Sequence, residues 1–173
     1  KILHVSTHDI TGGAARAAYR LHCGLRAAGF HSQMFVDHRT SRDPDVVALY
    51  RPMDAATRIS RKMRRAKHTR DLQPYRNTRP AGHERFTQEK SEHTLYLTGQ
   101  MPRADVVNLH WVADFVDYAA FFETVPDQAP VVWTLHDMNT FTGGCHYDRG
   151  CGKFANGCGA CPQIGSRTER DLA

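Results

Sequence analysis

The chain has 173 residues, of which 40% are hydrophobic and 24% charged, and its formal net charge is +5. This length and composition are typical of one folded globular domain and exclude a disordered or fibrous chain. No apolar run approaches the ~20 residues of a membrane-spanning helix, and Lys1 leads directly into a short apolar run, so we expect a cytoplasmic protein. The positive charge permits an anionic partner but selects none.

A strand, a glycine loop, a helix and a second strand are predicted at the start of the chain. Residues 2–6 form a short apolar run, and Gly12 and Gly13 end the loop that follows it. Gly29 stands where a C′ glycine would end the helix, and residues 33–37 predict the next strand. Five residues at spacings of three and four predict the buried face of the helix: Ala14, Ala18, Leu21, Leu25 and Ala28. The order of these elements indicates a βαβ unit.

The glycine loop is a candidate ligand-binding site. Free N–H groups at a helix N-terminus suit a phosphate or another anion, glycine lets a ligand approach the backbone, and Arg16 could add charge. A tight turn without a ligand explains the same two glycines. The G-x-G-x-x-G fingerprint of dinucleotide-binding folds is not met. Asp37, at the end of the second strand, nevertheless keeps a nicotinamide-dependent oxidoreductase as an alternative.

Residues 51–90 differ from the rest of the chain. They hold twelve of the 23 lysines and arginines but only four acidic residues. We expect a short strand at residues 46–50 before them, then a basic insertion with an amphipathic helix over residues 55–67 and loop elsewhere. This insertion is either a solvated surface segment or a patch for an anionic membrane surface or a lipid-linked acceptor.

The α/β pattern resumes after the insertion. Residues 105–111 predict a strand, and a helix is expected within residues 114–124. Residues 131–135 are almost continuously apolar, which is typical of a central parallel strand covered on both faces. Another helix is expected to begin at residues 168–172. We therefore expect one Rossmann-like domain over residues 1–173 that belongs to a longer enzyme.

Two histidines are predicted at strand ends. His110 and His136 each follow a strand at the edge where ligands bind in open α/β sheets, and Asp137 comes next. Such a histidine can donate a hydrogen bond to a sugar hydroxyl or stabilise a developing charge. The alternative is a buried histidine that shapes a loop. The remaining nine histidines are expected on the surface.

Four of the five cysteines form one cluster with the spacing C-x5-C-x6-C-x2-C, within a cysteine-rich insert over residues 143–163. They are Cys145, Cys151, Cys158 and Cys161. In a reducing compartment this spacing favours a closed structural zinc site over two disulfides or four free thiols, and His146 could replace one cysteine. Four protein ligands would leave no open position for catalysis. Cys23 stands alone in the first helix and is expected to be a small, partly buried residue.

Several segments together resemble a known family. The start KILHVST with TGGAARAAYRL, the segments DVVNLHW and VWTLHDM, and the later FTGGCHY and GCGACPQ resemble the N-terminal domain of bacterial family-four (group 1) GT-B glycosyltransferases. The two cysteine-containing segments resemble a subgroup with a cysteine-rich insert. The likeness covers both ends of the chain and skips most of residues 41–103.

The resemblance implies an enzyme of two Rossmann-like domains that face a cleft. Such enzymes move a sugar from a nucleotide-sugar to a polysaccharide or lipid-linked acceptor, retain the anomeric configuration and need no catalytic metal. Carried onto this chain, Gly12 and Gly13 would approach the donor diphosphate or the transferred sugar, and His136 would contact the sugar near the reacting carbon. From their places in the predicted fold, and not from the resemblance, His110, Asp137 and Arg16 are also expected to bind substrate.

The remaining catalytic groups of the family lie in its C-terminal domain. We therefore expect this acceptor-side, hexosyltransferase-type domain to be inactive without that second domain. The alternatives are a zinc-bearing nucleic-acid-binding module, a nicotinamide-dependent oxidoreductase and a pure binding domain. Against the first, the basic residues are not concentrated around the cysteines, and we expect no nucleic-acid partner.

Overall fold

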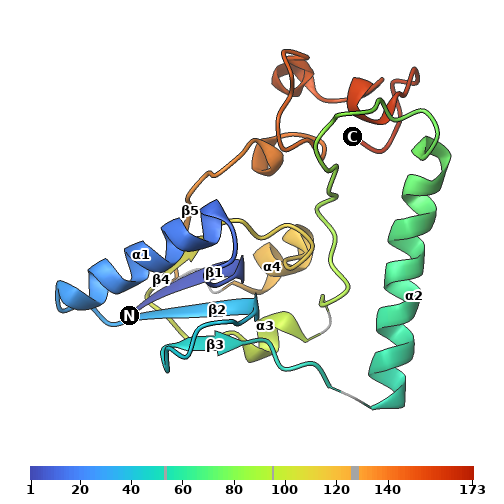
Figure 1. The fold of residues 1–173 in the computed structure, drawn as a ribbon. Coiled ribbons are helices and arrows are strands. Elements are labelled where there is room, and N and C mark those ends of the chain that lie inside the picture. The colour runs from blue at the N-terminus through green and yellow to red at the C-terminus, as the bar shows by residue number, and fades with distance from the viewer. Residues whose placement is uncertain (53, 95, 126–128) are drawn as a thin grey trace.

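The computed structural model describes residues 1–52, 54–94, 96–125 and 129–173, and Figure 1 shows their arrangement. Five parallel strands form one sheet in the order β3-β2-β1-β4-β5. The strands are β1 (Ile2–His8), β2 (Ser32–His38), β3 (Val46–Ala48), β4 (Val106–Leu109) and β5 (Val131–Trp133). The α-helices are α1 (Gly13–Ala27), α2 (Ala55–Leu72), α3 (Leu97–Gln100) and α4 (Tyr118–Thr124). Short 3-10 turns lie at Gln73–Tyr75, Asn139–Phe141, Lys153–Asn156 and Pro162–Ile164. The predicted Rossmann-like α/β fold is confirmed.

Strand alternation divides the side chains between two layers that cover the sheet. Leu3 and Val5 of β1 point into the larger core, which includes Phe121 of α4 and Leu97 of α3. His4 lies on the opposite face, which α1 covers, and its ring centroid is 6.1 Å from that of His22 in α1. Each face of the sheet is therefore covered by helix, as in a three-layer domain (Figure 1).

Helix α1 ends as predicted but buries a different face. Ala28 is its C-cap and Gly29 has a φ of 85°, while the N–H of Phe30 donates to the carbonyl of Leu25 at 2.9 Å. This is the Schellman arrangement expected of a C′ glycine. Three residues at spacings of three and four are buried: Ala15, Ala18 and His22. The predicted apolar face is wrong by part of a turn, since Leu21 is exposed and a histidine takes its place.

Two elements after the basic segment differ from expectation. Within the described sheet, strand β5 lies at an edge beside β4 and not in the centre, and Val132 is 50% exposed. No helix forms at residues 168–172, because this stretch is hydrogen-bonded to the cysteine-rich loop. The Asp171 carboxylate accepts from the N–H of Cys161 at 2.8 Å, and the N–H of Ala160 donates to the carbonyl of Thr168.

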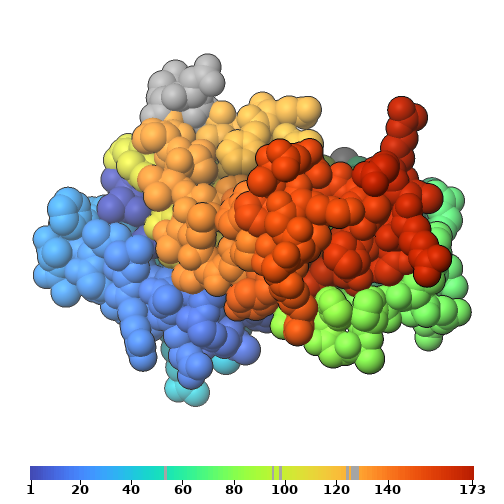
Figure 2. All heavy atoms as spheres, turned by 90° about the horizontal axis from the view of Figure 1, so that it is seen from above, coloured from blue at the N-terminus to red at the C-terminus, as the bar shows by residue number. Residues whose placement is uncertain are grey.

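Helix α2 stands beyond the carboxyl edge of the sheet and buries none of its residues (Figure 1). It runs through Leu72, five residues further than predicted. Its Asp54 N-cap accepts from the N–H of Thr57 at 2.9 Å. Figure 2 shows the last third of the chain spread between α1 and α2 on the upper side of the molecule. In this region the backbone of Phe86 forms an isolated antiparallel β-bridge with that of Cys145, and the Phe86 side chain packs with Ile164.

Candidate functional site

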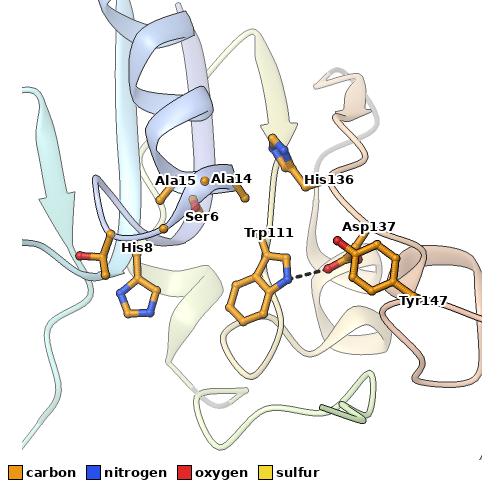
Figure 3. Close-up of a pocket in the computed structure, with 11 residues that line it drawn as sticks. Ser6, His8, Ala14, Ala15, Trp111, His136, Asp137 and Tyr147 are labelled. Carbon is orange, nitrogen blue, oxygen red and sulfur yellow. Dashed lines mark hydrogen bonds between the residues drawn. The ribbon is translucent and has the colours of Figure 1, made fainter. Parts of the chain in front are cut away.

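A pocket of about 630 Å³ lies at the carboxyl edge of β1 and β4, where the strand order of the sheet reverses (Figure 3). Ligands of open α/β folds bind at this switch point. We call it the switch-point pocket. Its lining combines the end of β1, the start of α1, residues after β4 and β5, and one residue of the cysteine-rich segment. The residues are Ser6, His8, Thr11, Gly12, Gly13, Ala14, Ala15, Trp111, His136, Asp137 and Tyr147.

The start of α1 opens into this pocket without a side-chain cap. Gly12 is the N-cap with a φ of 93°, and the first turn of the helix contains no acidic residue. The first N–H groups of a helix have no partner within it, so those at Gly13, Ala14 and Ala15 are available to a ligand. Gly12 needs glycine for its backbone conformation. At Gly13 a Cβ would meet nothing within 4 Å, so only an incoming ligand would require glycine there.

The loop before Gly12 is anchored by a buried carboxylate. Asp9 is fully buried and accepts the N–H groups of Ile10, Thr40 and Ser41 at 2.7–3.0 Å. Burial alone would raise the pKa of Asp9, but these hydrogen bonds outweigh it and lower the pKa. The loops after β1 and β2 are thereby held to each other. The sequence prediction missed this role of Asp9.

Three histidines form a hydrogen-bonded chain that ends in the pocket. His4 Nδ1 lies 3.0 Å from His110 Nε2, and His110 Nδ1 lies 3.0 Å from His136 Nε2. His4 is fully buried and His110 is 3% exposed, whereas His136 lines the pocket. Burial lowers the pKa of His4 to about 4 and that of His110 to about 3, and it also lowers the pKa of His136. All three rings are therefore neutral at pH 7.

Neutral imidazoles in such a chain must share one direction of donation. Each ring carries a single N–H, so the two N···N contacts are both satisfied only if every ring donates the same way. If donation runs from His4 towards His136, the N–H of His136 is on Nδ1. In the opposite direction Nδ1 of His136 is a bare acceptor and Nε2 of His4 carries a proton. Within the described part of the chain, His4 Nε2 has no hydrogen-bond partner.

The carboxylate of Asp137 is held by protein donors. It accepts from Trp111 Nε1 at 2.8 Å (Figure 3). It also accepts from His146 Nδ1 at 2.6 Å and from the N–H of Asn139 at 2.9 Å. Burial would raise the pKa of Asp137, but the bonds from His146, Asn139 and Trp111 outweigh it and lower the pKa. Asp137 therefore fixes Trp111 and the loop after β5 around the pocket, with little capacity left for a substrate.

His146 connects the cysteine-rich segment to the pocket. Its Nδ1 donates to Asp137, and its Nε2 lies 2.9 Å from the Thr87 hydroxyl. With both ring nitrogens used, His146 is not placed to replace a cysteine as a metal ligand. Tyr147, the next residue, reaches the pocket and remains 52% exposed (Figure 3).

The four clustered cysteines are free thiols that lie near one another. A hydrogen bond from Cys145 and N–H groups of the Cys161 loop lower the pKa of Cys161 to about 6, while the contact raises the pKa of Cys145. Cys158 Sγ accepts the N–H of Gly143 at 3.3 Å. These N–H and S–H donors suit thiolates. Across the described ranges, however, no group of three or more His, Cys, Asp or Glu side chains is arranged to hold a metal ion.

The structure brings some of the predicted site residues together and separates others. Gly12, Gly13, His136 and Asp137 share the switch-point pocket. His110 lies beneath His136, and Arg16 is exposed on α1, so neither lines the pocket.

Other pocket residues were missed by the sequence analysis: Ser6, His8, Thr11, Ala14, Ala15, Trp111 and Tyr147. The position of His8 just before the glycine loop was an available signal. Nothing in the sequence could place Tyr147, because it arrives from the distant insert. The expectation that the remaining histidines lie on the surface is wrong for four of them, which are buried: His4, His22, His93 and His146.

Asp37 belongs to a different cavity. A polar cavity of about 450 Å³ lies between α2 and the end of β2, and Asp37 lines it without reaching the switch-point pocket. Its carboxylate pairs with Arg51, and the His38 and His93 rings lie within 3.6 Å. Burial would raise the pKa of Asp37, but His93 and Arg51 outweigh it and lower the pKa. A ribose-binding carboxylate would instead have to face the glycine loop.

Among the described residues, no helix has the length and apolar character needed to cross a membrane. Comparisons with protein-family models, curated proteins and solved structures return no match to this chain.

Proposed function

We propose that this chain is the acceptor-side, N-terminal domain of a retaining GT-B glycosyltransferase that takes its sugar from a nucleotide-sugar. The acceptor would be a polysaccharide or a lipid-linked glycan, and the transfer would take place in the cytoplasm. One observation carries the proposal: the uncapped start of α1 and the ring of His136 line the same pocket at the switch point. An anion-binding group and a neutral hydrogen-bonding ring are thus held side by side.

The two parts of the pocket suit the two parts of a nucleotide-sugar. N–H groups at a helix start bind phosphoryl or sugar oxygens, and they need no reorganisation as negative charge develops on the leaving diphosphate. The hydroxyl of Ser6 also lines the pocket; it is 1% exposed and has no hydrogen-bond partner among the described residues. A ligand hydroxyl would satisfy it.

The histidine chain would fix the proton on His136. A buried N–H without an acceptor is rarer in proteins than an unused acceptor, so the chain is expected to leave His4 Nε2 unprotonated. Donation then runs from His4 through His110 to His136, whose N–H is on Nδ1. His136 would serve as a donor to a sugar oxygen near the reacting carbon. His110 and His4 would act as positioning residues, since they reach the ligand only through His136.

Breaking the sugar–phosphate bond requires more than this chain offers. None of the described residues that line the pocket is a lysine or arginine, and Arg16 lies outside it. The cations that neutralise the diphosphate would therefore come from a second domain, and closure of that domain would exclude water.

The cysteine cluster would hold a structural zinc ion through Cys145, Cys151, Cys158 and Cys161. The thiolate-type donors and the backbone N–H bonds to sulfur suit that metal, although the sulfurs would have to close further around it. Such an ion would fix the loop that carries His146 and Tyr147 to the pocket. It would have no part in the chemistry of transfer.

Two of the three alternative functions have less support than glycosyl transfer. A nicotinamide-dependent enzyme would use Asp37 on the cofactor ribose, and Asp37 is paired within another cavity. A zinc-bearing nucleic-acid module would use the basic helix α2, which holds none of the clustered cysteines.

Saturation-transfer NMR tests the proposal because it detects weak ligands. We expect signal transfer to uridine-, guanosine- or thymidine-diphosphate hexoses but not to NAD. The transfer should be lost in His136→Ala and kept in His31→Gln, a change of an exposed histidine. Binding of NAD without binding of any nucleotide-sugar would refute the assignment, and so would unchanged binding by His136→Ala.

A further inference from the structure

Helix α2 presents a face that no other described part of the chain covers. None of its eighteen residues is buried, and Ile59 and Met63 are 60% and 68% exposed. Together with Ala56 and Ala66 they recur at spacings of three and four, so they form one stripe along the helix. A shallow groove runs along this outer face, flanked by Lys67 and Arg70.

Helix α2 is also strongly basic, and Arg64, Lys67 and Arg70 line its outer groove. Helix α2 contains seven lysines and arginines but only one acidic residue, Asp71. No lysine or arginine of α2 belongs to an ion pair of the described residues. Arg65 and His68 face the other way and line the polar cavity towards the sheet. The helix therefore has an inner face directed at its own protein and an outer face with apolar residues between cations.

We propose that the outer face of α2 docks on the surface of an anionic phospholipid bilayer. Long basic side chains can extend to phosphate head groups while their methylene stems and the apolar stripe enter the interface. The negative surface potential of an anionic leaflet attracts such a cluster. Because α2 stands beyond the carboxyl edge of the sheet, docking would turn that edge towards the lipid surface (Figure 1).

Lipid fits this face better than nucleic acid does. A nucleic-acid surface would make use of the cations, and it commonly adds aromatic residues on which bases stack. Helix α2 contains no Phe, Tyr or Trp. The exposed side chains of Ile59 and Met63 would make no favourable contact with a phosphate backbone, whereas both can be buried in a bilayer interface.

Vesicle co-sedimentation of the whole chain tests the inference. We expect binding to phosphatidylcholine vesicles that contain phosphatidylglycerol, little binding to phosphatidylcholine alone, and a decrease at high salt. Ile59→Ser with Met63→Ser should lower the partition coefficient by about tenfold, since two apolar anchors are lost. Lys62→Glu with Lys67→Glu, which flank the stripe, should abolish binding.

The matched control is Arg58→Glu with Arg65→Glu, which changes the net charge equally and should retain most of the binding. Arg65 lines the polar cavity on the inner face, and Arg58, seven residues earlier, lies on the same side of the helix. Circular dichroism checks that each variant keeps its helix. Equal loss in the inner-face and outer-face pairs would overturn docking through this face, as would equal binding to neutral and anionic vesicles. Binding of duplex DNA that persists in Ile59→Ser/Met63→Ser, without vesicle binding, would assign the helix to nucleic acid. None of these outcomes bears on the switch-point pocket, which shares no residue with α2.

Discussion

His110 Nδ1 lies 3.0 Å from His136 Nε2, and this contact joins a buried ring directly after β4 to a ring in the pocket. His110 in turn contacts His4 at the same distance. The protonation of His136 is thus coupled to two residues that a ligand cannot touch.

The first prediction concerns the tautomer of His136. In the unmodified chain we expect its N–H on Nδ1. His110→Leu removes the partner of His136 Nε2, so a mixture of the two tautomers should appear. Long-range ¹H–¹⁵N correlation spectra distinguish the tautomers directly. His31→Gln is the control and should leave the His136 signals unchanged. A His136 signal that is identical in His110→Leu would show that the contact does not set the tautomer.

The second prediction concerns acid stability. Because burial lowers the pKa of His4 to about 4 and that of His110 to about 3, the unfolded chain takes up protons first as the pH falls below 6.5. The stabilisation that these two neutral histidines contribute to the free energy of unfolding should therefore be fully present above pH 6.5. It should decline towards pH 4 by roughly 1.4 kcal/mol per pH unit for each histidine. Urea titrations at several pH values between 7.5 and 4.5 measure this slope, and the decline should begin at ~6.5, the pKa of histidine in an unfolded chain.

A variant separates these histidines from other titrating groups. His4→Leu removes one of the two sites, so the decline below pH 6.5 should become shallower by about half of their joint contribution. An unaltered slope in His4→Leu would mean that His4 is not buried in its neutral form.

The third prediction separates the two glycines of the loop. Gly12→Ala should destabilise the fold by about 1–2 kcal/mol, because its φ of 93° is strained for alanine. Gly13→Ala should leave stability unchanged or raise it by up to ~1 kcal/mol, since the added Cβ meets open space within a helix. The same methyl group would cover the N–H groups, so nucleotide-sugar binding should weaken. Destabilisation by Gly13→Ala, or undiminished binding, would contradict this division of roles.

The fourth prediction concerns the cysteine cluster. The purified chain should contain one zinc ion per molecule, and a chelator should lower its melting temperature. Cys151→Ser should reduce the bound zinc, whereas Cys23→Ser, outside the cluster, should retain it. Metal analysis by mass spectrometry and a thiol titration measure both. A metal-free chain with five freely titrating thiols would contradict the proposal that the cysteine cluster binds zinc.

The sequence predicted the parts of the fold whose signals are local. The Schellman end of α1 follows from Gly29, and the start of the helix follows from Gly12 and Gly13. The failures come from contacts across the sheet. In the sequence, His4 is a single polar residue within an apolar strand. Its contact with His110 becomes evident only when β4 is paired with β1, because the alternation of side chains then places the two rings on the same face.

Other parts of the site depend on the distant insert. Tyr147 lines the pocket beside His146, which is bonded to Asp137 and Thr87, and neither bond has a sequence signature. The edge position of β5 is likewise a property of strand order, which an apolar run does not encode.

The most direct test is a ¹H–¹⁵N spectrum of the chain titrated with the nucleotide-sugar that gives the strongest saturation transfer. We expect shifts that concentrate on the N–H groups of Gly13, Ala14 and Ala15, the indole of Trp111 and the ring of His136. Shifts confined to the polar cavity at Asp37, with none at the start of α1, would contradict the claim that Gly13 and His136 serve one ligand.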